Sequence, residues 1–324
     1  MTTRGFVLGK FMPPHTGHVS LCEAASRMVD ELTILVCWLP DDPIAGEQRL
    51  AWMRELFPSA RVVGHGEPVP QYPEGRPDFW PVWERIVRAA HPEAIDLLFA
   101  GEAYGEELAR RAGGRFVPLG GRFLDEDRDG PGGVSASAVC ADPARNWRWV
   151  PPVVRRDLVR TVSLHGVEST GKSTIAGRLA QDLDTISVPE YGRSHCIVHG
   201  TECTAWDLET IAAAQQAMIE AARPWSGPIL LTDTDWVMTR AWHRMMLGTA
   251  MAGPSYPLAD LYILLSPDVP WIDDGLRLYG DEGRRRLFDR LCREELDAVG
   301  ARWIEVSGDW DSRHAGTLAA IDAL

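Results

Sequence analysis

The chain has 324 residues, a length that predicts two domains. Its 45% hydrophobic and 24% charged residues are ordinary for a globular protein, and no apolar run is long enough to span a membrane. The net charge of −13, with both halves acidic, argues against broad electrostatic binding to nucleic acid. An anionic substrate must therefore be held by local groups.

The cysteines and the first residues bear on the cellular compartment. The six cysteines are scattered and form no CxxC pair, which argues against a zinc site and against a disulfide framework. No signal-peptide pattern precedes the first strand-like segment. Together these features predict a cytoplasmic protein. The sequence leaves room for a homo-oligomer and does not determine the oligomeric state.

Strand-like and helix-like segments alternate in the first half. Strands are expected at residues 6–10, 32–38, 61–64, 95–100 and 116–119, and helices at 17–28, 46–57, 79–90 and 104–112. Residues 120–133 are expected to form a polar loop, whereas residues 142–154 predict a packed connector because Trp147 and Trp149 need something to bury against.

The second half restarts the alternation. Strands are expected at residues 161–165, 185–188, 229–232, 261–265 and 302–306, and helices at 172–183, 204–222, 235–247, 282–299 and 311–324. Strands alternating with helices indicate parallel sheets with crossover connections. The predicted fold class is therefore α/β, with two doubly wound parallel-sheet domains, residues 1–150 and 151–324.

A phosphate-binding loop is the strongest motif. Residues 166–173 read GVESTGKS, follow a strand and open a helix, which is the context that a P-loop requires. A glycine-rich turn that merely caps a helix is the alternative. The residues expected to hold ATP are Gly166, Glu168, Ser169, Thr170, Gly171, Lys172, Ser173 and Thr174, with Lys172 at the β- and γ-phosphates and the Ser173 hydroxyl on Mg²⁺.

Charged residues follow three later segments of this half. Asp233 ends a buried strand and is expected to hold Mg²⁺, while Asp235 either acts at the site or caps the next helix. Glu190 is expected to accept the proton of a substrate hydroxyl, and Arg193 to hold a polar substrate group; a surface ion pair is the alternative. Arg277, with residues 284–286, suits a lid over the phosphates, although a solvated helix face explains at least one of these arginines.

A second motif lies near the N-terminus. Only two of the 33 basic residues are lysines, Lys10 and Lys172, and each lies in a glycine-bearing motif. Lys10 precedes His15 and His18, which straddle a glycine at a predicted helix start, where an anion would be attracted. These residues, with Gly9 and Phe11 of the same segment, are expected to bind a nucleotide and to stabilise charge on its α-phosphate and on departing pyrophosphate. A helix-capping turn with ordinary histidines is the alternative.

The two motifs in this order resemble a known family. The first half is similar to the HxGH nucleotidylyltransferase superfamily, and the whole chain resembles the NadR-type family, in which a nicotinamide-mononucleotide adenylyltransferase is fused to a ribosylnicotinamide kinase. The resemblance rests on the segments GKFMPPHTGH, NWRWVPPVVR, HGVESTGKST, PEYGR, LTDTD and WIDDGLR.

The resemblance implies that ribosylnicotinamide is phosphorylated with Mg-ATP and that the resulting nicotinamide mononucleotide is joined to AMP from a second ATP, giving NAD and pyrophosphate. It assigns His15 and His18 to the α-phosphate, Gly166 to Thr174 to ATP, Asp233 to magnesium and Arg277 to the lid. Glu190 as the base is inferred from its place at a strand end.

The sequence departs from the family in two respects. Some relatives carry an N-terminal helix-turn-helix, whereas here the first motif starts at residue 9, so repressor function is not expected. In the superfamily's second signature Ser135 and Ser137 remain as nucleotide contacts, but Cys140 stands where an arginine is expected. Losing one charge-assisted phosphate contact costs about 1.5–3 kcal/mol. Adenylyl transfer is then weakened, rescued by another arginine such as Arg145, or lost.

Two other functions remain open. In the first, the kinase is active but the N-terminal half is a binding module that senses NAD or ATP, which Cys140 favours and the intact His15, His18 and Lys10 oppose. In the second, the same fusion acts on a different nucleoside or coenzyme precursor, because no residue in the sequence identifies the base that is recognised.

Overall fold

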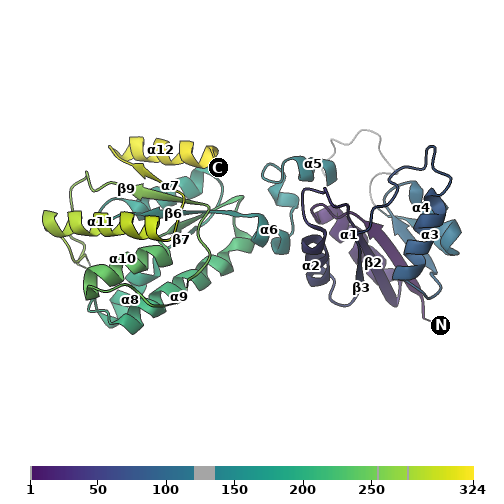
Figure 1. The fold of residues 1–324 in the computed structure, drawn as a ribbon, viewed down its shortest axis with the longest axis horizontal. Helices are drawn as coiled ribbons and strands as arrows, with labels where there is room; N and C mark the ends of the chain where they lie inside the picture. The colour runs from purple at the N-terminus through teal and green to yellow at the C-terminus, as the bar shows by residue number, and fades with distance from the viewer. Residues whose placement is uncertain (1, 120–135, 254, 276) are drawn as a thin grey trace. The chain divides into compact units, whose positions relative to one another are not determined.

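The computed structural model describes residues 2–119, 136–253, 255–275 and 277–324 (Figure 1). The chain divides into two compact units, Met1–Val154 and Arg155–Leu324. No helix within the described ranges is long and apolar enough to cross a lipid bilayer. The predicted loop at residues 120–133 lies outside the described residues.

The first unit is built on a parallel sheet with strand order β3-β2-β1-β4-β5. Its strands are β1 (Arg4–Gly9), β2 (Glu31–Cys37), β3 (Arg61–His65), β4 (Leu97–Ala100) and β5 (Arg115–Pro118). Its helices are α1 (Thr16–Met28), α2 (Gly46–Leu56), α3 (Phe79–Ala90), α4 (Tyr104–Ala112) and α5 (Ala136–Ala141), followed by the 3₁₀ helix η2 (Trp147–Trp149). The strand order reverses direction at β1, the position where open α/β sheets bind ligands.

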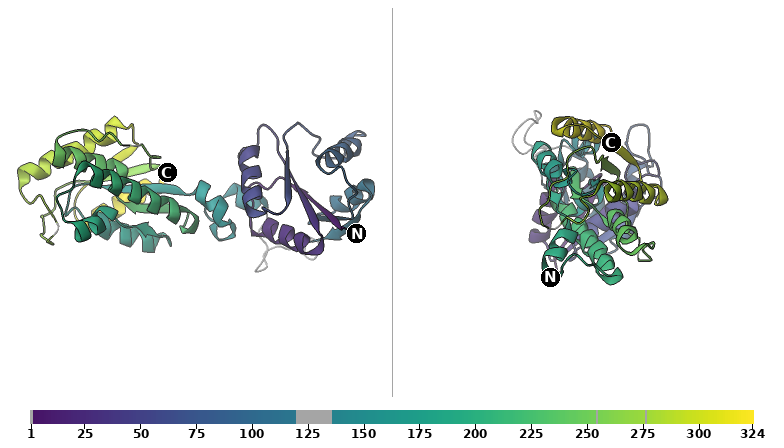
Figure 2. Two further views of the ribbon diagram at one scale, coloured as in Figure 1. Left: turned by 90° about the horizontal axis from the view of Figure 1, so that it is seen from below. Right: turned by 90° about the vertical axis from the view of Figure 1, so that its left-hand side faces the viewer.

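Alternate residues of each central strand serve the two faces of this sheet. Val7 and Ile34 pack with α1 and α2 on one face, whereas Phe6 and Leu35 pack with α3 and α4 on the other. The layers can be followed in the left-hand view of Figure 2. Both faces are covered, so the strands are apolar on both sides, as in other parallel sheets.

The second unit repeats this architecture with strand order β10-β9-β6-β8-β7. Its strands are β6 (Arg160–His165), β7 (Ser187–Val188), β8 (Ile229–Asp233), β9 (Leu261–Leu265) and β10 (Trp303–Val306). Its helices are α7 (Lys172–Asp182), α8 (Tyr191–His199), α9 (Ala205–Ala222), α10 (Trp236–Leu247), α11 (Glu282–Ala298) and α12 (Trp310–Asp322), with the 3₁₀ helix η3 (Arg223–Trp225); α6 (Pro152–Leu158) spans the boundary between the units. Apolar residues of α7 and α12 form the core on one face, and those of α9, α10 and α11 form it on the other.

The predicted fold class is confirmed, since both sheets are parallel and have helices on both faces. The helices predicted at 79–90 and 104–112 have the observed limits of α3 and α4. The prediction missed α8, because its first residues were interpreted only as a turn after a strand. In the connector, Trp147 is buried as expected and Trp149 is half-buried.

A tryptophan beside β2 packs against three glycines. The indole of Trp38 is so close to Gly46, Gly64 and Gly66 that a Cβ built on them would lie 2.0, 2.6 and 2.4 Å from it. No side chain other than hydrogen fits at these positions while the indole stays where it is. The three glycines are therefore required by packing.

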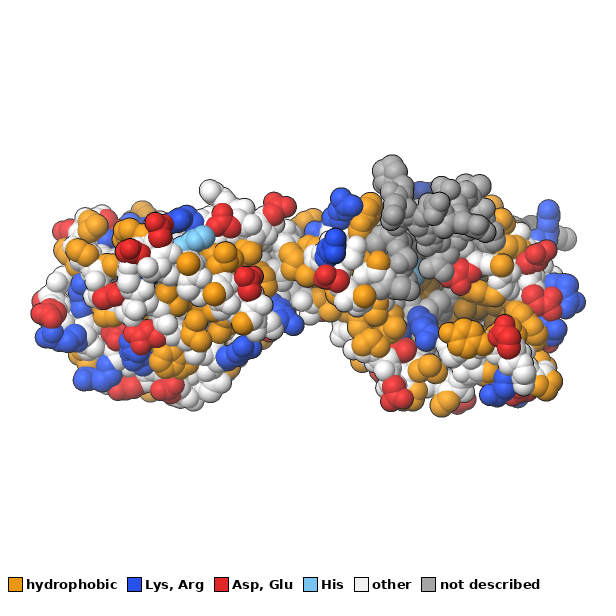
Figure 3. Space-filling model, turned by 90° about the horizontal axis from the view of Figure 1, so that it is seen from above, with side chains coloured by type: hydrophobic (Ala, Val, Ile, Leu, Met, Phe, Trp, Pro, Cys, Tyr) orange, Lys and Arg blue, Asp and Glu red, His pale blue; other side chains and the backbone are white. Residues whose placement is uncertain are grey.

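Charged side chains are mixed over the surface. On the face seen in Figure 3, the described acidic and basic side chains of both units are interspersed with apolar ones. Such a surface suits a protein whose anionic ligands are held by local groups.

Candidate active sites

The phosphate-binding loop joins β6 to α7. Gly166 and Gly171 have φ angles of 134° and 89°, which favour glycine, and Ser169 is also left-handed at 64°. A Cβ on Gly166 would lie 2.6 Å from the Leu265 carbonyl oxygen. Thr170 is buried, and its hydroxyl donates to the Val167 carbonyl at 2.8 Å. The loop therefore wraps around the N-terminus of α7 and turns its backbone amides toward an anion site.

Lysine, serine and aspartate side chains meet at this N-terminus. Lys172 Nζ donates to the carbonyl oxygens of Gly166 (2.9 Å) and Val167 (3.2 Å), so it lies across the mouth of the loop. The Ser173 hydroxyl donates to Asp233 Oδ2 at the end of β8. Asp233 is 4% exposed, and its Oδ1 has no hydrogen-bond partner among the described residues.

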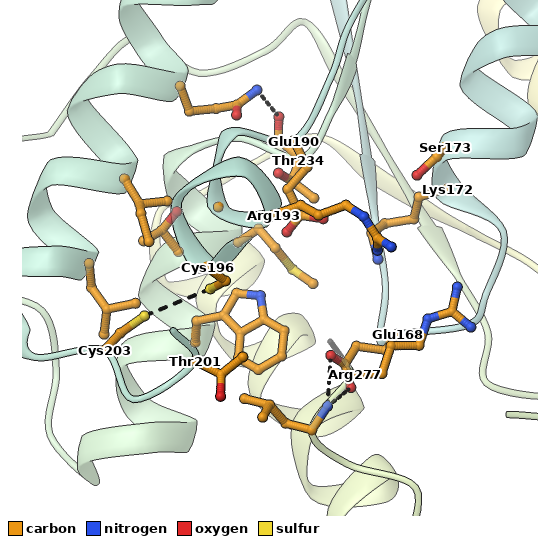
Figure 4. A pocket seen from close by; sticks show the side chains of 18 of the residues that line it. Glu168, Lys172, Ser173, Glu190, Arg193, Cys196, Thr201, Cys203, Thr234 and Arg277 are labelled. Atoms are coloured by element: carbon orange, nitrogen blue, oxygen red, sulfur yellow. Dashed lines mark hydrogen bonds between the residues drawn. The ribbon is translucent and has the colours of Figure 1, made fainter. Parts of the chain in front are cut away.

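A cavity of about 200 Å³ opens beside the loop, toward α8, α9 and α10 (Figure 4). In Figure 4 Lys172 and Ser173 lie on one side of the cavity, and Cys196, Cys203 and Thr201 lie on the other. The predicted residues that line it are Glu168, Ser169, Gly171, Lys172, Ser173, Thr174, Glu190, Arg193 and Arg277. The structure therefore brings most of the predicted second-unit site residues to one cavity.

Glu190 is one of two glutamates on the wall of this cavity, with Glu168. It is half-buried and precedes α8, whose first turn carries Arg193. The pKa of Glu190 is raised from 4.5 to about 7, chiefly by burial; the carboxylates of Asp233 and Glu168 add to the rise, and Lys172 and Arg193 oppose it. A carboxylate with a pKa near neutrality is suited to accept a proton at physiological pH.

The segment that carries Arg277 lies against the P-loop. Glu168 accepts hydrogen bonds from the backbone amides of Leu278 (3.0 Å) and Tyr279 (3.1 Å). Arg277 Nη1 donates to the Ser169 hydroxyl at 2.7 Å, and its Nε lies 3.3 Å from Asp274, which also pairs with Arg193 at 2.7 Å. Arg277 is therefore held at the cavity edge by a network that includes two P-loop side chains.

The arginines at 284–286 behave differently. Arg284 and Arg286 are exposed and pair with Asp281 and Glu282 of their own helix region, as expected for a solvated helix face. Arg285 donates to the Val269 carbonyl at 3.2 Å. They do not line the described cavity.

Helix α12 holds the P-loop from the opposite side. Arg313 is fully buried, and its guanidinium donates to the carbonyl oxygens of Thr170 (3.3 Å), Ser266 (2.9 Å) and Gly308 (2.8 Å). It also pairs with Asp268. A single side chain thus ties the P-loop to the loops that follow β9 and β10.

Asp235 is the N-cap residue of helix α10. Its carboxylate accepts from the Val237 amide at 2.9 Å, at the start of α10, and lies 3.0 Å from His165 Nε2. It does not line the cavity. Of the two readings that the sequence left open, the structure favours the N-cap.

In the first unit, both motif histidines lie at the N-terminus of α1. His15 is the N-cap: its Nδ1 accepts from the Gly17 amide at 3.1 Å, while His18 Nδ1 accepts from the His15 amide at 3.4 Å. Each neutral ring therefore carries its hydrogen on Nε2 and can donate it to an anion. The ring centroids of His15 and His18 are 3.9 Å apart, and the ring of buried Phe11 packs edge-on against His18 with a centroid separation of 5.0 Å. Both histidines therefore cap the start of α1, as the alternative interpretation expected, and this geometry is compatible with anion binding.

Lys10 follows Gly9, the last residue of β1, and is tied to α2. Its carbonyl accepts from the fully buried Arg49 at 2.8 Å, and its ammonium lies 3.7 Å from Asp42. Arg49 also pairs with Asp42 at 2.8 Å. Burial raises the pKa of Asp42, but the Leu39 amide, Arg49 and Lys10 together lower it below its usual value.

The remaining predicted residues are partly outside the described chain. Ser135 lies outside it, and Ser137 lies on α5. Cys140 is half-buried on the same helix, and the Arg145 amide donates to Asp142 at 2.9 Å.

Sequence reasoning missed the far wall of the cavity. Its residues come from α8, from α9 and the loop before it, from the turn after β8 and from α10, and their residue types carry no motif. The missed residues include Cys196, Cys203, Thr201, Gln215, Thr234, Met238 and Trp242. The one local signal was the polar strand end at residues 232–235.

Comparisons with known proteins agree with this geometry. A family model described as an AAA domain matches residues 161–313. Two curated proteins, each named a trifunctional NAD biosynthesis/regulator protein NadR, from Escherichia coli (strain K12) and Salmonella typhimurium (strain LT2), are 30% identical to the chain over 96% and 95% of its length and 80% of theirs.

Two solved structures share the fold of the whole chain. One is a NadR protein in complex with NR, with a TM-score of 0.71 and 20% identity over 99% of this chain and 96% of that one. The other is a NadR protein in complex with NAD and AMP-PNP, with a TM-score of 0.68 and 19% identity over 100% and 96%.

Proposed function

Because the chain belongs to the NadR family, we propose that it catalyses two successive ATP-dependent steps of NAD biosynthesis, one in each unit. The second unit phosphorylates ribosylnicotinamide to nicotinamide mononucleotide. The first unit transfers AMP from a second ATP to that product, giving NAD and pyrophosphate. The observation that carries the proposal is the cavity in which the P-loop lysine faces a base of raised pKa, Glu190.

In the kinase step, the chain's residues position two reactants. The P-loop amides and Lys172 hold the triphosphate, and Arg277, at the cavity edge, contacts its transferred phosphate. Glu190 accepts the proton of the 5′-hydroxyl as that oxygen bonds to the γ-phosphorus, and ADP leaves as the bond to the β-phosphate oxygen breaks. Arg193, in the first turn of α8, orients the nucleoside.

The residues around Ser173 fit a magnesium ion. The orphaned Oδ1 of buried Asp233 and the Ser173 hydroxyl are hard oxygen donors at the phosphate site. When bound there, Mg²⁺ neutralises charge on the β- and γ-phosphates. The chain's part is to hold both oxygens at the N-terminus of α7.

In the adenylyltransferase step, the positive end of α1 and the Nε2–H groups of His15 and His18 stabilise charge on the α-phosphate of ATP. The mononucleotide's phosphate oxygen attacks that phosphorus and pyrophosphate leaves. Lys10, whose side chain is 43% exposed and whose ammonium is paired with Asp42, is available to move onto the pyrophosphate.

Mass spectrometry of the products formed from ribosylnicotinamide and excess Mg-ATP tests both steps. NAD and pyrophosphate are expected from the wild type. Lys172→Ala should abolish mononucleotide formation and still convert added mononucleotide to NAD, whereas His18→Ala should accumulate the mononucleotide. If either change abolishes both reactions in folded protein, the two-site proposal is wrong.

Cys140 supports a second candidate, in which the first unit only senses nucleotide. In that case the wild type makes the mononucleotide and binds NAD but releases no pyrophosphate. A panel with other nucleosides and with dephospho-coenzyme A separates the proposed substrate from the alternative fusion.

A further inference from the structure

A buried histidine–aspartate pair lies behind the P-loop. His165 ends β6 and immediately precedes Gly166, and Asp235 follows the proposed magnesium ligand Asp233 by two residues. His165 Nε2 lies 3.0 Å from Asp235 Oδ1, and the two residues are 0% and 3% exposed. The pair therefore joins the strand that leads into the P-loop to the segment that carries the carboxylate.

The residue between the two aspartates has a strained backbone. Thr234 has a φ of 73°, in the left-handed region, which is unusual for a β-branched residue. Such a conformation persists only where its surroundings enforce it, and it is found preferentially at functional sites. Thr234 lines the cavity, as Figure 4 shows, so the bend points this residue at the ligand site.

Contacts on both sides enforce the bend. The Thr234 amide donates to the Leu164 carbonyl at 3.1 Å, and the Thr234 carbonyl accepts from the Thr232 hydroxyl and from Gln215 Nε2. Asp235 then restrains the chain immediately after the bend, because its carboxylate contacts both His165 and the first turn of α10. Besides His165, the helix cap and Tyr262, whose hydroxyl interacts with the Asp235 carboxylate, restrain the side chain that follows the bend.

We propose that His165 and Asp235 are positioning residues of the kinase site. Their hydrogen bond holds residue 234 in the left-handed conformation and so keeps Asp233 against Ser173. The inference rests on the proposed function only in taking Asp233 as a magnesium ligand. Neither His165 nor Asp235 lines the described cavity, so they act through Asp233 and Thr234.

Three substitutions separate this role from helix capping. Asp235→Ser keeps a good N-cap but is too short to reach His165. His165→Leu removes the ring nitrogen that contacts Asp235. His165→Gln is the matched control, because the amide N–H of glutamine can reach the Asp235 carboxylate. The melting temperature of each variant shows whether the fold is retained.

Calorimetry of ADP binding, with and without Mg²⁺, is the main measurement. Mg²⁺ should raise the affinity of the wild type for ADP. In Asp235→Ser and in His165→Leu, this Mg²⁺-dependent rise in affinity should be at least tenfold smaller than in the wild type. Their Mg²⁺-free affinity should stay within twofold of wild type, and His165→Gln should behave as wild type. An unchanged gain in both variants, an equal fall in Mg²⁺-free affinity, or no gain in the wild type would overturn the inference.

Thr234→Gly tests the bend itself. Glycine adopts a positive φ without strain, so residue 234 then keeps its conformation without help from the His165–Asp235 contact. The loss of Mg²⁺-dependent affinity gain caused by Asp235→Ser should therefore be at least fivefold smaller in the Thr234→Gly background than in the wild-type background. If the fold-changes caused by Thr234→Gly and by Asp235→Ser simply multiply in the double variant, the inference is contradicted. If Asp235→Ser does not fold, the comparison of His165→Leu with His165→Gln decides the matter. If the calorimetric pattern holds but ribosylnicotinamide is not phosphorylated, the proposed function fails and the inference stands.

Discussion

The raised pKa of Glu190 makes a quantitative prediction for the kinase. Burial and two neighbouring carboxylates hold this pKa at about 7, against an ordinary 4.5. A base must be deprotonated to act, so activity is lost as pH falls through the pKa. The active fraction is then about one-tenth at pH 6 and nine-tenths at pH 8, a rise of about tenfold. An unperturbed glutamate would give no change across this range.

The assay is kcat/KM for ribosylnicotinamide at saturating Mg-ATP, from pH 5.5 to 8.5. Glu190→Gln should lower it by about 10²–10⁴-fold and remove the acidic limb. Arg193→Gln removes a cation that lowers this pKa, so its limb should move to higher pH. A flat wild-type profile, or the same limb in Glu190→Gln, would refute the assignment of Glu190 as the base. Melting temperatures across the same range control for unfolding.

Three further predictions concern other parts of the chain. Gly46→Ala, which forces a Cβ to within 2.0 Å of Trp38, should destabilise its unit by about 1–3 kcal/mol in urea unfolding; Gly177→Ala, with nothing within 4 Å, is the control and should not destabilise. Arg49→Met leaves the Asp42 carboxylate buried without its guanidinium partner, and it should lower the free energy of unfolding by about 3–5 kcal/mol in the same measurement. A variant as stable as the wild type would contradict this. Ser173→Ala should raise the Mg²⁺ concentration for half-maximal kinase rate about tenfold, in a titration at fixed ATP.

Local patterns explain why so much of the P-loop was predictable. Its glycines, Lys172 and Ser173 are consecutive, and the adjoining strand and helix have ordinary hydrophobic periodicity. The backbone conformation follows from the residues themselves, as the positive φ of Gly166 and Gly171 illustrates. The HxGH segment is similar, because a capping histidine interacts within one turn of helix.

The cavity wall and the buried pair depend on long-range packing. Cys203 and Trp242 reach the cavity from separate elements, and their residue types are as common in cores as in sites. His165 and Asp235 are 70 residues apart and meet only because β6 and β8 are neighbours in the sheet. A sequence pattern predicted these strands and left open which of their side chains would pair.

The buried Arg313 links α12 to the P-loop, and we expect this link to affect nucleotide affinity. Because its guanidinium anchors the Thr170 carbonyl from 143 positions away, fraying of this helix would free the loop that grips the triphosphate. Bound nucleotide should, by reciprocity, slow amide hydrogen exchange along the helix. Substitutions in α12 thus offer a way to change the affinity for ATP without altering any residue that contacts the nucleotide.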